Sequence, residues 1–108
     1  MKLLLLPLML LVSVSLCTQQ PTQDIKQQAV FSCLQTCKDN AALKSYENGP
    51  CLSDNNTEWN VSDWVCDVAH NPRTWSDDDI ENQCANVFGD TAHHFVEVDP
   101  DCNFIKLY

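Results

Sequence analysis

Residues 24–46 read DIKQQAVFSCLQTCKDNAALKSY, and this stretch sets the architecture because it joins a helical repeat to two cysteines. Apolar residues recur at three- and four-residue steps from Ile25 to Ala41, with glutamine, lysine and aspartate between them. The pattern predicts a helix over residues 24–46. Cys33 and Cys37 are one turn apart and project from the same face, so we expect each to bond a cysteine elsewhere in the chain.

The cysteine count indicates a covalent framework. After the first 17 residues the chain has six cysteines: Cys33, Cys37, Cys51, Cys66, Cys84 and Cys102. An even set in a small exported chain is typical of disulfides, whereas the same count in a cytosolic protein would suggest thiol chemistry or a metal. Six cysteines allow 15 pairings. Excluding a bond between Cys33 and Cys37 removes some of these and leaves the others open.

The N-terminal segment has the features of a secretory signal peptide. Lys2 supplies a positive start, residues 3–12 are apolar apart from one proline, and small residues lead to Cys17. A run of about ten apolar residues is too short to span a bilayer, which requires roughly 20. We therefore expect residues 1–17 to be a signal peptide and the protein to be secreted.

Lipid attachment at Cys17 is the alternative. The polar segment after it resembles the tether of a lipoprotein, and a lipid on Cys17 would hold the protein at the cell surface. Leu16 stands where the lipoprotein pattern has glycine, alanine or serine, which favours the soluble form. In both forms we expect a polar tether over residues 18–24 and one disulfide-stabilised domain over residues 25–108.

The charge balance limits the partners. The chain carries 15 acidic residues against six lysines and arginines, a formal net charge of −9 with neutral histidines. Such a chain repels phosphate backbones, and no basic stripe compensates, so we expect no nucleic-acid partner. Anionic membrane surfaces are disfavoured for the same reason, so membrane contact is expected only through an anchor at Cys17.

The middle of the chain predicts a loop, a strand and a second helix. Residues 53–63 are rich in asparagine and aspartate, which favour turns, and predict an exposed loop. Residues 64–68 alternate like a short strand. Residues 76–89 begin with Ser76 as an N-cap, continue with acids in the first turn and helical apolar spacing, and end at Gly89.

The C-terminal segment predicts a β-hairpin. Residues 95–98 and 103–108 flank a turn that contains proline. Alternation along the two strands places Glu97 opposite Lys106, so we expect a cross-strand ion pair between them.

The best metal-ligand candidates also lie near the C-terminus. His93, His94, Glu97 and Asp99 supply the imidazole and carboxylate groups that suit zinc or a related divalent ion. Adjacent side chains in a strand face opposite sides, so solvated strand-end residues are the alternative. The acids at 77–79 lack the EF-hand spacing, although a weak surface calcium site is an alternative to their role at a helix start. We expect no cofactor.

Other candidate functional residues are few. No serine has a Gly-x-Ser-x-Gly environment, and His70 with Asp67 three residues before it is the one compact polar group of hydrolase type. A locally hydrogen-bonded turn is the alternative for His70. N-glycosylation acceptor patterns begin at Asn55 and Asn60.

Three tryptophans lie within seventeen positions. We expect Trp64 in the core. Trp59 and Trp75 are either core residues or exposed residues that bind a partner.

The segments GPCLS (49–53), WVCDVAH (64–70), NQC (82–84) and HFVEVD (94–99) carry a resemblance to other proteins. In these segments the chain resembles small secreted or lipid-anchored, cysteine-containing proteins of archaea and bacteria whose function is unknown. The resemblance implies a cell-surface setting and no catalytic residue.

These observations predict a small α+β domain in which two helices pack on a short antiparallel sheet with a C-terminal β-hairpin, stapled by three disulfides. We expect a secreted or surface-tethered, non-enzymatic binding or effector protein of toxin-like type. Its acidic surface and exposed aromatic residues would meet an extracellular protein or carbohydrate. An extracellular metal- or calcium-binding protein is the first alternative, and a small hydrolase is the second.

Overall fold

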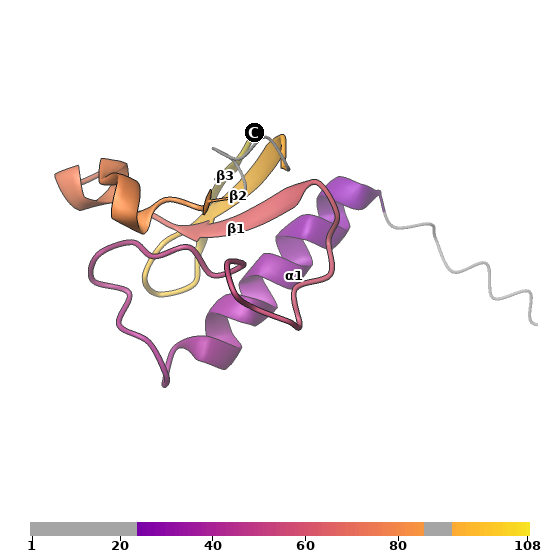
Figure 1. Ribbon diagram of the computed structural model, residues 1–108, viewed down its shortest axis with the longest axis horizontal. Helices are drawn as coiled ribbons and strands as arrows, with labels where there is room; N and C mark the ends of the chain where they lie inside the picture. The colour runs from indigo at the N-terminus through magenta and orange to yellow at the C-terminus, as the bar shows by residue number, and fades with distance from the viewer. Residues whose placement is uncertain (1–23, 86–91) are drawn as a thin grey trace, which may run out of the picture.

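The computed structural model describes residues 24–85 and 92–108. Its elements, in chain order, are the helix α1 (Ile25–Asn40), the strand β1 (Trp64–Val68), the 3-10 turns η1 (Trp75–Asp78) and η2 (Ile80–Asn82), and the strands β2 (His94–Val98) and β3 (Phe104–Leu107). The strands form one sheet in the order β1-β2-β3, and α1 packs across one face of it (Figure 1). The predicted small, disulfide-stapled α+β domain is confirmed, with one α-helix among the described residues instead of two.

The sheet is mixed, so the prediction of an antiparallel sheet is wrong for one of its two strand pairs. β1 runs parallel to β2, with Asp67 opposite Glu97, whereas β2 and β3 are antiparallel. The predicted C-terminal hairpin is matched in part, with a shorter second strand and a register shift between Glu97 and Val98. β2 begins beside the start of β1, with His94 opposite Trp64, so a crossover connection joins the two strands. Such a crossover connection leaves no mark on the local alternation of either strand.

α1 ends at Asn40, so the prediction that the helix extends to residue 46 is wrong. The Asn40 side chain donates to the Thr36 carbonyl, and the chain then turns back so that the buried Tyr46 hydroxyl donates to the Cys37 carbonyl at 2.6 Å. The Cys37 carbonyl is one of the last four of the helix, which lack a partner within it, so the Tyr46 hydroxyl satisfies it. Residues 41–45 therefore form an exposed turn despite their helical pattern.

The second helix, predicted over residues 76–89, is replaced in its described part by the short turns η1 and η2. The N-cap of the first turn is Thr74 instead of Ser76, and Asp79 between the turns is extended. The helical path is interrupted at Asp79, whose side chain accepts a hydrogen bond from the Glu81 N–H and begins the second short turn. The predicted end of this helix, at Gly89, lies outside the described residues.

The main core fills the space between α1 and the sheet. Its buried members on these elements are Ala29, Cys33, Cys37, Trp64, Cys66, Val68, Val96 and Val98. Trp64 is 5% exposed, which confirms its predicted place in the core. The predicted loop 53–63 is mostly exposed, but Ser53 and Val61 are buried, and the Ser53 hydroxyl accepts a hydrogen bond from the Cys66 N–H.

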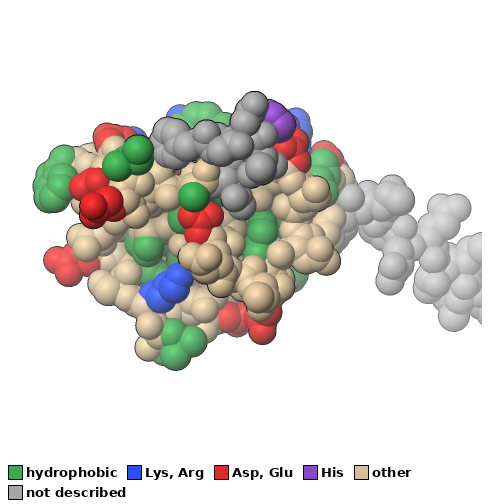
Figure 2. Space-filling view, viewed as in Figure 1, with side chains coloured by type: hydrophobic (Ala, Val, Ile, Leu, Met, Phe, Trp, Pro, Cys, Tyr) green, Lys and Arg blue, Asp and Glu red, His purple; other side chains and the backbone are tan. Residues whose placement is uncertain are grey.

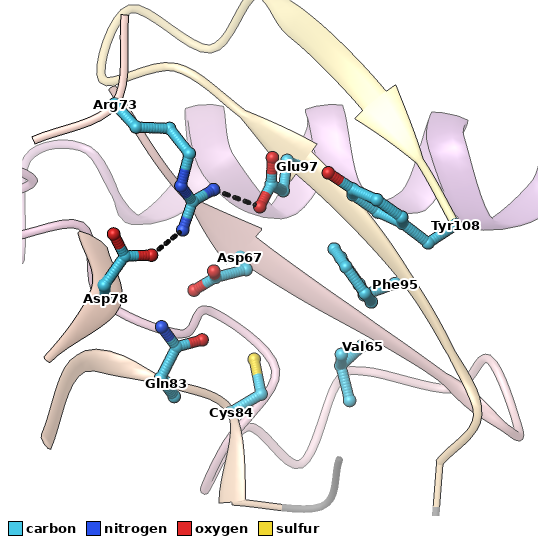
Figure 3. Close-up of a pocket in the computed structure, with 9 residues that line it drawn as sticks. All are labelled: Val65, Asp67, Arg73, Asp78, Gln83, Cys84, Phe95, Glu97 and Tyr108. Atoms are coloured by element: carbon cyan, nitrogen blue, oxygen red, sulfur yellow. Dashed lines mark hydrogen bonds and ion pairs between the residues drawn. The ribbon is translucent and has the colours of Figure 1, made fainter. Parts of the chain in front are cut away.

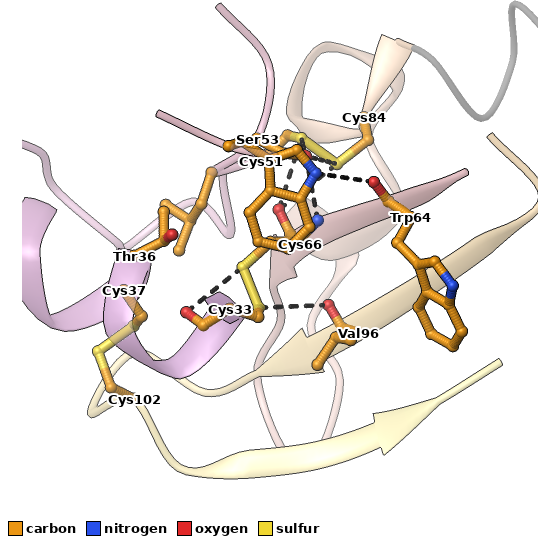
Figure 4. Close-up of a disulfide and its surroundings, with 12 residues drawn as sticks. Cys33, Thr36, Cys37, Cys51, Ser53, Trp64, Cys66, Cys84, Val96 and Cys102 are labelled. Carbon is orange, nitrogen blue, oxygen red and sulfur yellow. Dashed lines mark hydrogen bonds between the residues drawn. A yellow bond between two sulfur atoms is a disulfide. The ribbon is translucent and has the colours of Figure 1, made fainter. Parts of the chain in front are cut away.

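Three disulfides join these elements, and the close-up around Cys33 shows all of their sulfur atoms (Figure 4). The bonds are Cys33–Cys66, Cys37–Cys102 and Cys51–Cys84. The prediction that Cys33 and Cys37 bond different partners is confirmed. The two bonds from α1 hold the helix on the sheet, and the third ties the segment beside β1 to the end of η2.

Gly49 lies where residues 49–50 approach the η1 turn. Its φ is +68°, and a Cβ at this position would collide with Asp77 Oδ1 and lie 2.8 Å from the Val68 carbonyl oxygen. We expect Gly49→Ala to lower the free energy of unfolding by about 2 kcal/mol or more, because it adds left-handed backbone strain to the displacement of Asp77. Urea unfolding measures this change. A variant as stable as the wild type would contradict the packing of Gly49 against Asp77.

Candidate functional site

The face of the sheet opposite α1 carries a pocket, which we call the carboxyl pocket. Strand alternation sends Trp64, Cys66 and Val68 toward α1 and sends Val65 and Asp67 to the other face. The pocket has a volume of about 300 Å³. Its walls are Val65 and Asp67 of β1, Phe95 and Glu97 of β2, Arg73, Asp78, Gln83 and Cys84 of the crossover, and Tyr108 (Figure 3).

Arg73 bridges the sheet and the crossover above this pocket. Its Nη1 donates to Glu97 Oε1 at 2.6 Å, and its Nη2 donates to Asp78 Oδ1 at 2.9 Å and to the Asp77 carbonyl at 3.3 Å. Glu97 is buried, so its charge requires this partner. The predicted ion pair between Glu97 and Lys106 has the correct register, but the Glu97 carboxylate bonds Arg73 instead.

Asp67 is the unusual group of the carboxyl pocket. Its side chain points into the space between Arg73, Asp78 and Gln83 (Figure 3), it is 6% exposed, and its Oδ1 is buried with no hydrogen-bond partner within the described structure. Burial, reinforced by the negative charge of Glu97, raises the pKa of Asp67 to about 8. Arg73 opposes this rise in pKa but does not cancel it. At neutral pH Asp67 is therefore mainly a neutral carboxylic acid.

Two stacked aromatic rings form the wall of the pocket on the other side of Glu97. The rings of Phe95 and Tyr108 have centroids 4.0 Å apart, and the Lys106 ammonium lies 3.8 Å from the centroid of the Tyr108 ring. The pocket therefore combines an apolar wall with a group of carboxyls.

A second polar network lies beside the pocket, around the buried Asp77. Its carboxylate accepts hydrogen bonds from the backbone N–H groups of His70 and Thr74 and contacts His70 Nδ1 at 2.9 Å. Burial opposes ionisation, yet these hydrogen bonds hold the pKa of Asp77 below its usual value. The Thr74 hydroxyl also lies 3.2 Å from Nδ1 of His70. A proton relay of hydrolase type needs the acid and the hydroxyl on opposite ring nitrogens, whereas both lie at the same nitrogen here. The predicted grouping of His70 with Asp67 is replaced by this pairing with Asp77.

Residues 74–82, which we call the acidic tip, project from one end of the domain beside the carboxyl pocket. Trp75 is 81% exposed and Ile80 is 73% exposed. The tip also carries Asp78, Asp79 and Glu81, and Figure 2 shows hydrophobic and acidic side chains next to each other at this end of the molecule. Of the two positions left open for these tryptophans, Trp75 takes the exposed one, whereas Trp59 is half-buried and donates from Nε1 to the Trp64 carbonyl at 2.9 Å.

The backbone of the acidic tip is held from several sides. Asp77 caps its start, Arg73 bonds Asp78, and the Asn82 amide donates to the Ser76 carbonyl at 2.9 Å. The Cys51–Cys84 disulfide lies just after the tip. The exposed Trp75 and Ile80 are therefore presented on a fixed frame and lose little freedom on binding.

The predicted metal ligands are not brought together as one group. His93 and His94 face Asp63, with His93 Nδ1 2.5 Å and His94 Nε2 3.8 Å from its two carboxylate oxygens. Glu97 bonds Arg73, and the Asp99 carboxylate accepts bonds from the turn of the hairpin. Hydrogen bonds from His93 lower the pKa of Asp63.

Among residues 24–85 and 92–108, the metal-ligand atoms that do converge belong to Cys51, Asp54 and Cys84. The two sulfur atoms are joined in a disulfide, so they cannot bind a metal as thiolates. Asn55 and Asn60 are both exposed, and their glycosylation stays a prediction. The predicted signal peptide, the tether and Cys17 lie outside the described residues.

Sequence reasoning missed the carboxyl pocket. Asp67 stands alone among apolar residues in β1, and all five residues of this strand are buried. An acid inside such a strand is the signal that could have indicated a buried carboxyl. Its neighbour Glu97 could not have been assigned, because the parallel pairing of the two strands was not predicted.

Comparison of the chain with known proteins gave no matching family model, no matching curated protein and no matching solved structure. The resemblance to small exported cysteine-containing proteins stays a prediction.

Proposed function

We propose that this protein is an extracellular, non-enzymatic binding or effector protein that recognises a partner protein through the acidic tip. The observation that carries the proposal is the exposure of Trp75 and Ile80 on a backbone fixed by Asp77, Arg73 and a disulfide. Exposed tryptophan on a fixed frame is typical of residues that dominate protein interfaces.

The extracellular setting is supported by the covalent framework. Three disulfides in a small domain are typical of oxidising compartments. Within the described residues, no helix has the length and apolarity needed to cross a membrane. A secretory leader over residues 1–17, with lipid attachment at Cys17 as its alternative, belongs to the same proposal.

The chemistry of the acidic tip defines the partner surface. Trp75 and Ile80 require an apolar recess, and the surrounding Asp78, Asp79 and Glu81 favour lysine or arginine at its rim. A protein surface offers both together. The chain's net charge of −9 adds a long-range attraction to such a basic partner, which speeds association at low salt.

Removing the Trp75 ring tests the proposal. We expect Trp75→Ala to weaken binding of an extracellular partner by about 30-fold or more, because a central interface tryptophan contributes about 2 kcal/mol or more, and to leave the melting temperature unchanged. Affinity capture from the extracellular fraction of the source cells, followed by titration of the captured protein, measures this. The emission of Trp75 should also shift to the blue in the complex.

Phe31 provides the matched control. It is 66% exposed and lies in an apolar groove between α1 and β3, away from the acidic tip. Phe31→Ala should leave the same binding intact. A partner that is lost with Phe31→Ala but retained with Trp75→Ala would refute the proposed role of the tip.

A further inference from the structure

The carboxyl pocket holds a buried polar group whose partner the described chain does not supply. Asp67 is more than nine-tenths buried, its Oδ1 has no hydrogen bond, and its side chain points into the pocket. Buried polar atoms in native proteins are almost always paired, and an orphaned one indicates an absent partner. A ligand in the pocket would contact this group directly.

The charges around Asp67 select the sign of that ligand. The acids Glu97, Asp77 and Asp54 act on Asp67 from three different segments, and Arg73 is the cation that opposes them. Arg73 is already bonded to Glu97 and Asp78. The acids around Asp67 outnumber this one cation, so the local charge repels an anion and attracts a cation, which would also provide the missing donor for Asp67.

The size and walls of the pocket select an organic cation over a metal ion. Its volume of about 300 Å³ suits a small molecule, and the stacked Phe95 and Tyr108 rings offer it an apolar surface. The ligand atoms of Asp67, Glu97 and Asp78 do not converge closely enough to form a metal-binding group. A donor with several N–H bonds and an apolar body fits both sides of the pocket.

We propose that the carboxyl pocket binds a primary organic amine as its ammonium cation, with the ammonium at Asp67 and Glu97 and the apolar body against Phe95 and Tyr108. This site shares Asp78 with the acidic tip, but amine binding does not depend on partner binding by Trp75 and Ile80. The ammonium belongs either to a free amine or to a lysine side chain, and the chemistry at Asp67 is the same.

Binding of the ammonium should release one proton from Asp67. The free pocket holds Asp67 as a neutral acid near pH 6.5, since burial keeps its pKa at about 8. The ammonium stabilises the ionised form of Asp67, so the Asp67 proton passes to the buffer. The neutral acid is then replaced by a carboxylate paired with the ammonium. One ammonium enters for each proton that leaves, and the total charge of the pocket and its contents is unchanged.

Calorimetry with phenethylamine tests the proposal. At pH 6.5 we expect saturable 1:1 binding and release of about one proton, measured in two buffers with different ionisation enthalpies. Phenethyl alcohol, the neutral analogue, should bind at least tenfold more weakly. N-acetyl-lysine N-methylamide forms a second arm, and tighter binding of this probe than of phenethylamine would identify a lysine side chain as the source of the ammonium.

Variants separate the role of Asp67 from general electrostatics. Asp67→Asn keeps the shape of the side chain, and it should weaken phenethylamine binding at least tenfold and abolish proton release. Asp101→Asn removes an exposed acid outside the pocket and should change neither. Equal binding of phenethyl alcohol and phenethylamine by the wild type, no binding of either amine at millimolar concentration, or full binding by Asp67→Asn would overturn the proposal.

Discussion

Replacing Cys33 and Cys66 together by alanine should lower the free energy of unfolding by about 4 kcal/mol or more, because the bond closes a loop with a sequence separation of 33. Both residues are fully buried between α1 and the sheet, so loss of sulfur packing adds to the chain-entropy effect. Small domains have net stabilities of about 5–15 kcal/mol. The variant should therefore be close to unfolding at 37 °C, and urea unfolding followed by circular dichroism measures its loss of stability.

The Cys51–Cys84 bond provides a matched control. Its sequence separation is also 33, so the chain-entropy effect of removing it is the same, but it lies outside the main core. Cys51 and Cys84 are 8% and 3% exposed in a smaller cluster, so the Cys33/Cys66 variant, which loses fully buried sulfurs from the main core, should be the less stable of the two. If it is the more stable variant, α1 is not held on the sheet as the structure shows.

The stability of the protein should fall as the pH rises from 5 to 8, and Asp67 is the cause. The folded-state pKa of Asp67 is raised from 3.8 to about 8. Between these values the folded state holds a proton that the unfolded state has lost, so each added pH unit favours unfolding by up to about 1.4 kcal/mol. The stabilisation is complete below the unfolded pKa and is lost as the pH approaches 8.

Comparison with Asp67→Asn isolates this effect. The amide in this variant does not titrate, so the difference in unfolding free energy between wild type and variant should shift by several kcal/mol, in favour of the variant, between pH 5 and pH 8. The carboxyls of Asp63, Asp77 and Asp99 have lowered pKa values and change stability only at more acidic pH. Asp101→Asn should follow the wild type. A difference between wild type and Asp67→Asn that is constant over this range would contradict a buried neutral Asp67.

Local patterns predicted the elements that depend on local interactions. The apolar repeat and the two parallel cysteines indicated α1, and the alternation of residues 64–68 indicated β1. The hairpin turn was predictable because proline and aspartate determine its geometry within a few residues. The exclusion of a Cys33–Cys37 bond also followed from geometry within one helix.

Two features that the sequence did not predict depend on single side-chain hydrogen bonds, which override the periodic pattern of apolar residues. The helix at 76–89 was expected from its caps and spacing, but Asp79 is extended and its side chain caps a second short turn at the Glu81 N–H. The end of α1 is set by Tyr46 reaching back to Cys37. Nothing in the local pattern of either segment reveals these partners.

The candidate sites also include one that local sequence features indicated and one that they did not. Trp75 was recognised as a candidate from residue type alone, because an exposed tryptophan in an acidic segment is a local feature. The carboxyl pocket depends on parallel pairing that sets Asp67 beside Glu97 and on Arg73 arriving from the crossover. Residue spacing therefore could not have assembled it.

The most direct test of this account is the titration of Asp67 itself. Carbon-13 NMR of its side-chain carboxyl, assigned by comparison with Asp67→Asn, follows protonation of this one group in the folded protein. We predict a midpoint near pH 8. A midpoint below about pH 5, in the range of ordinary aspartates, would show that Asp67 is solvated or paired and would contradict the account of the carboxyl pocket.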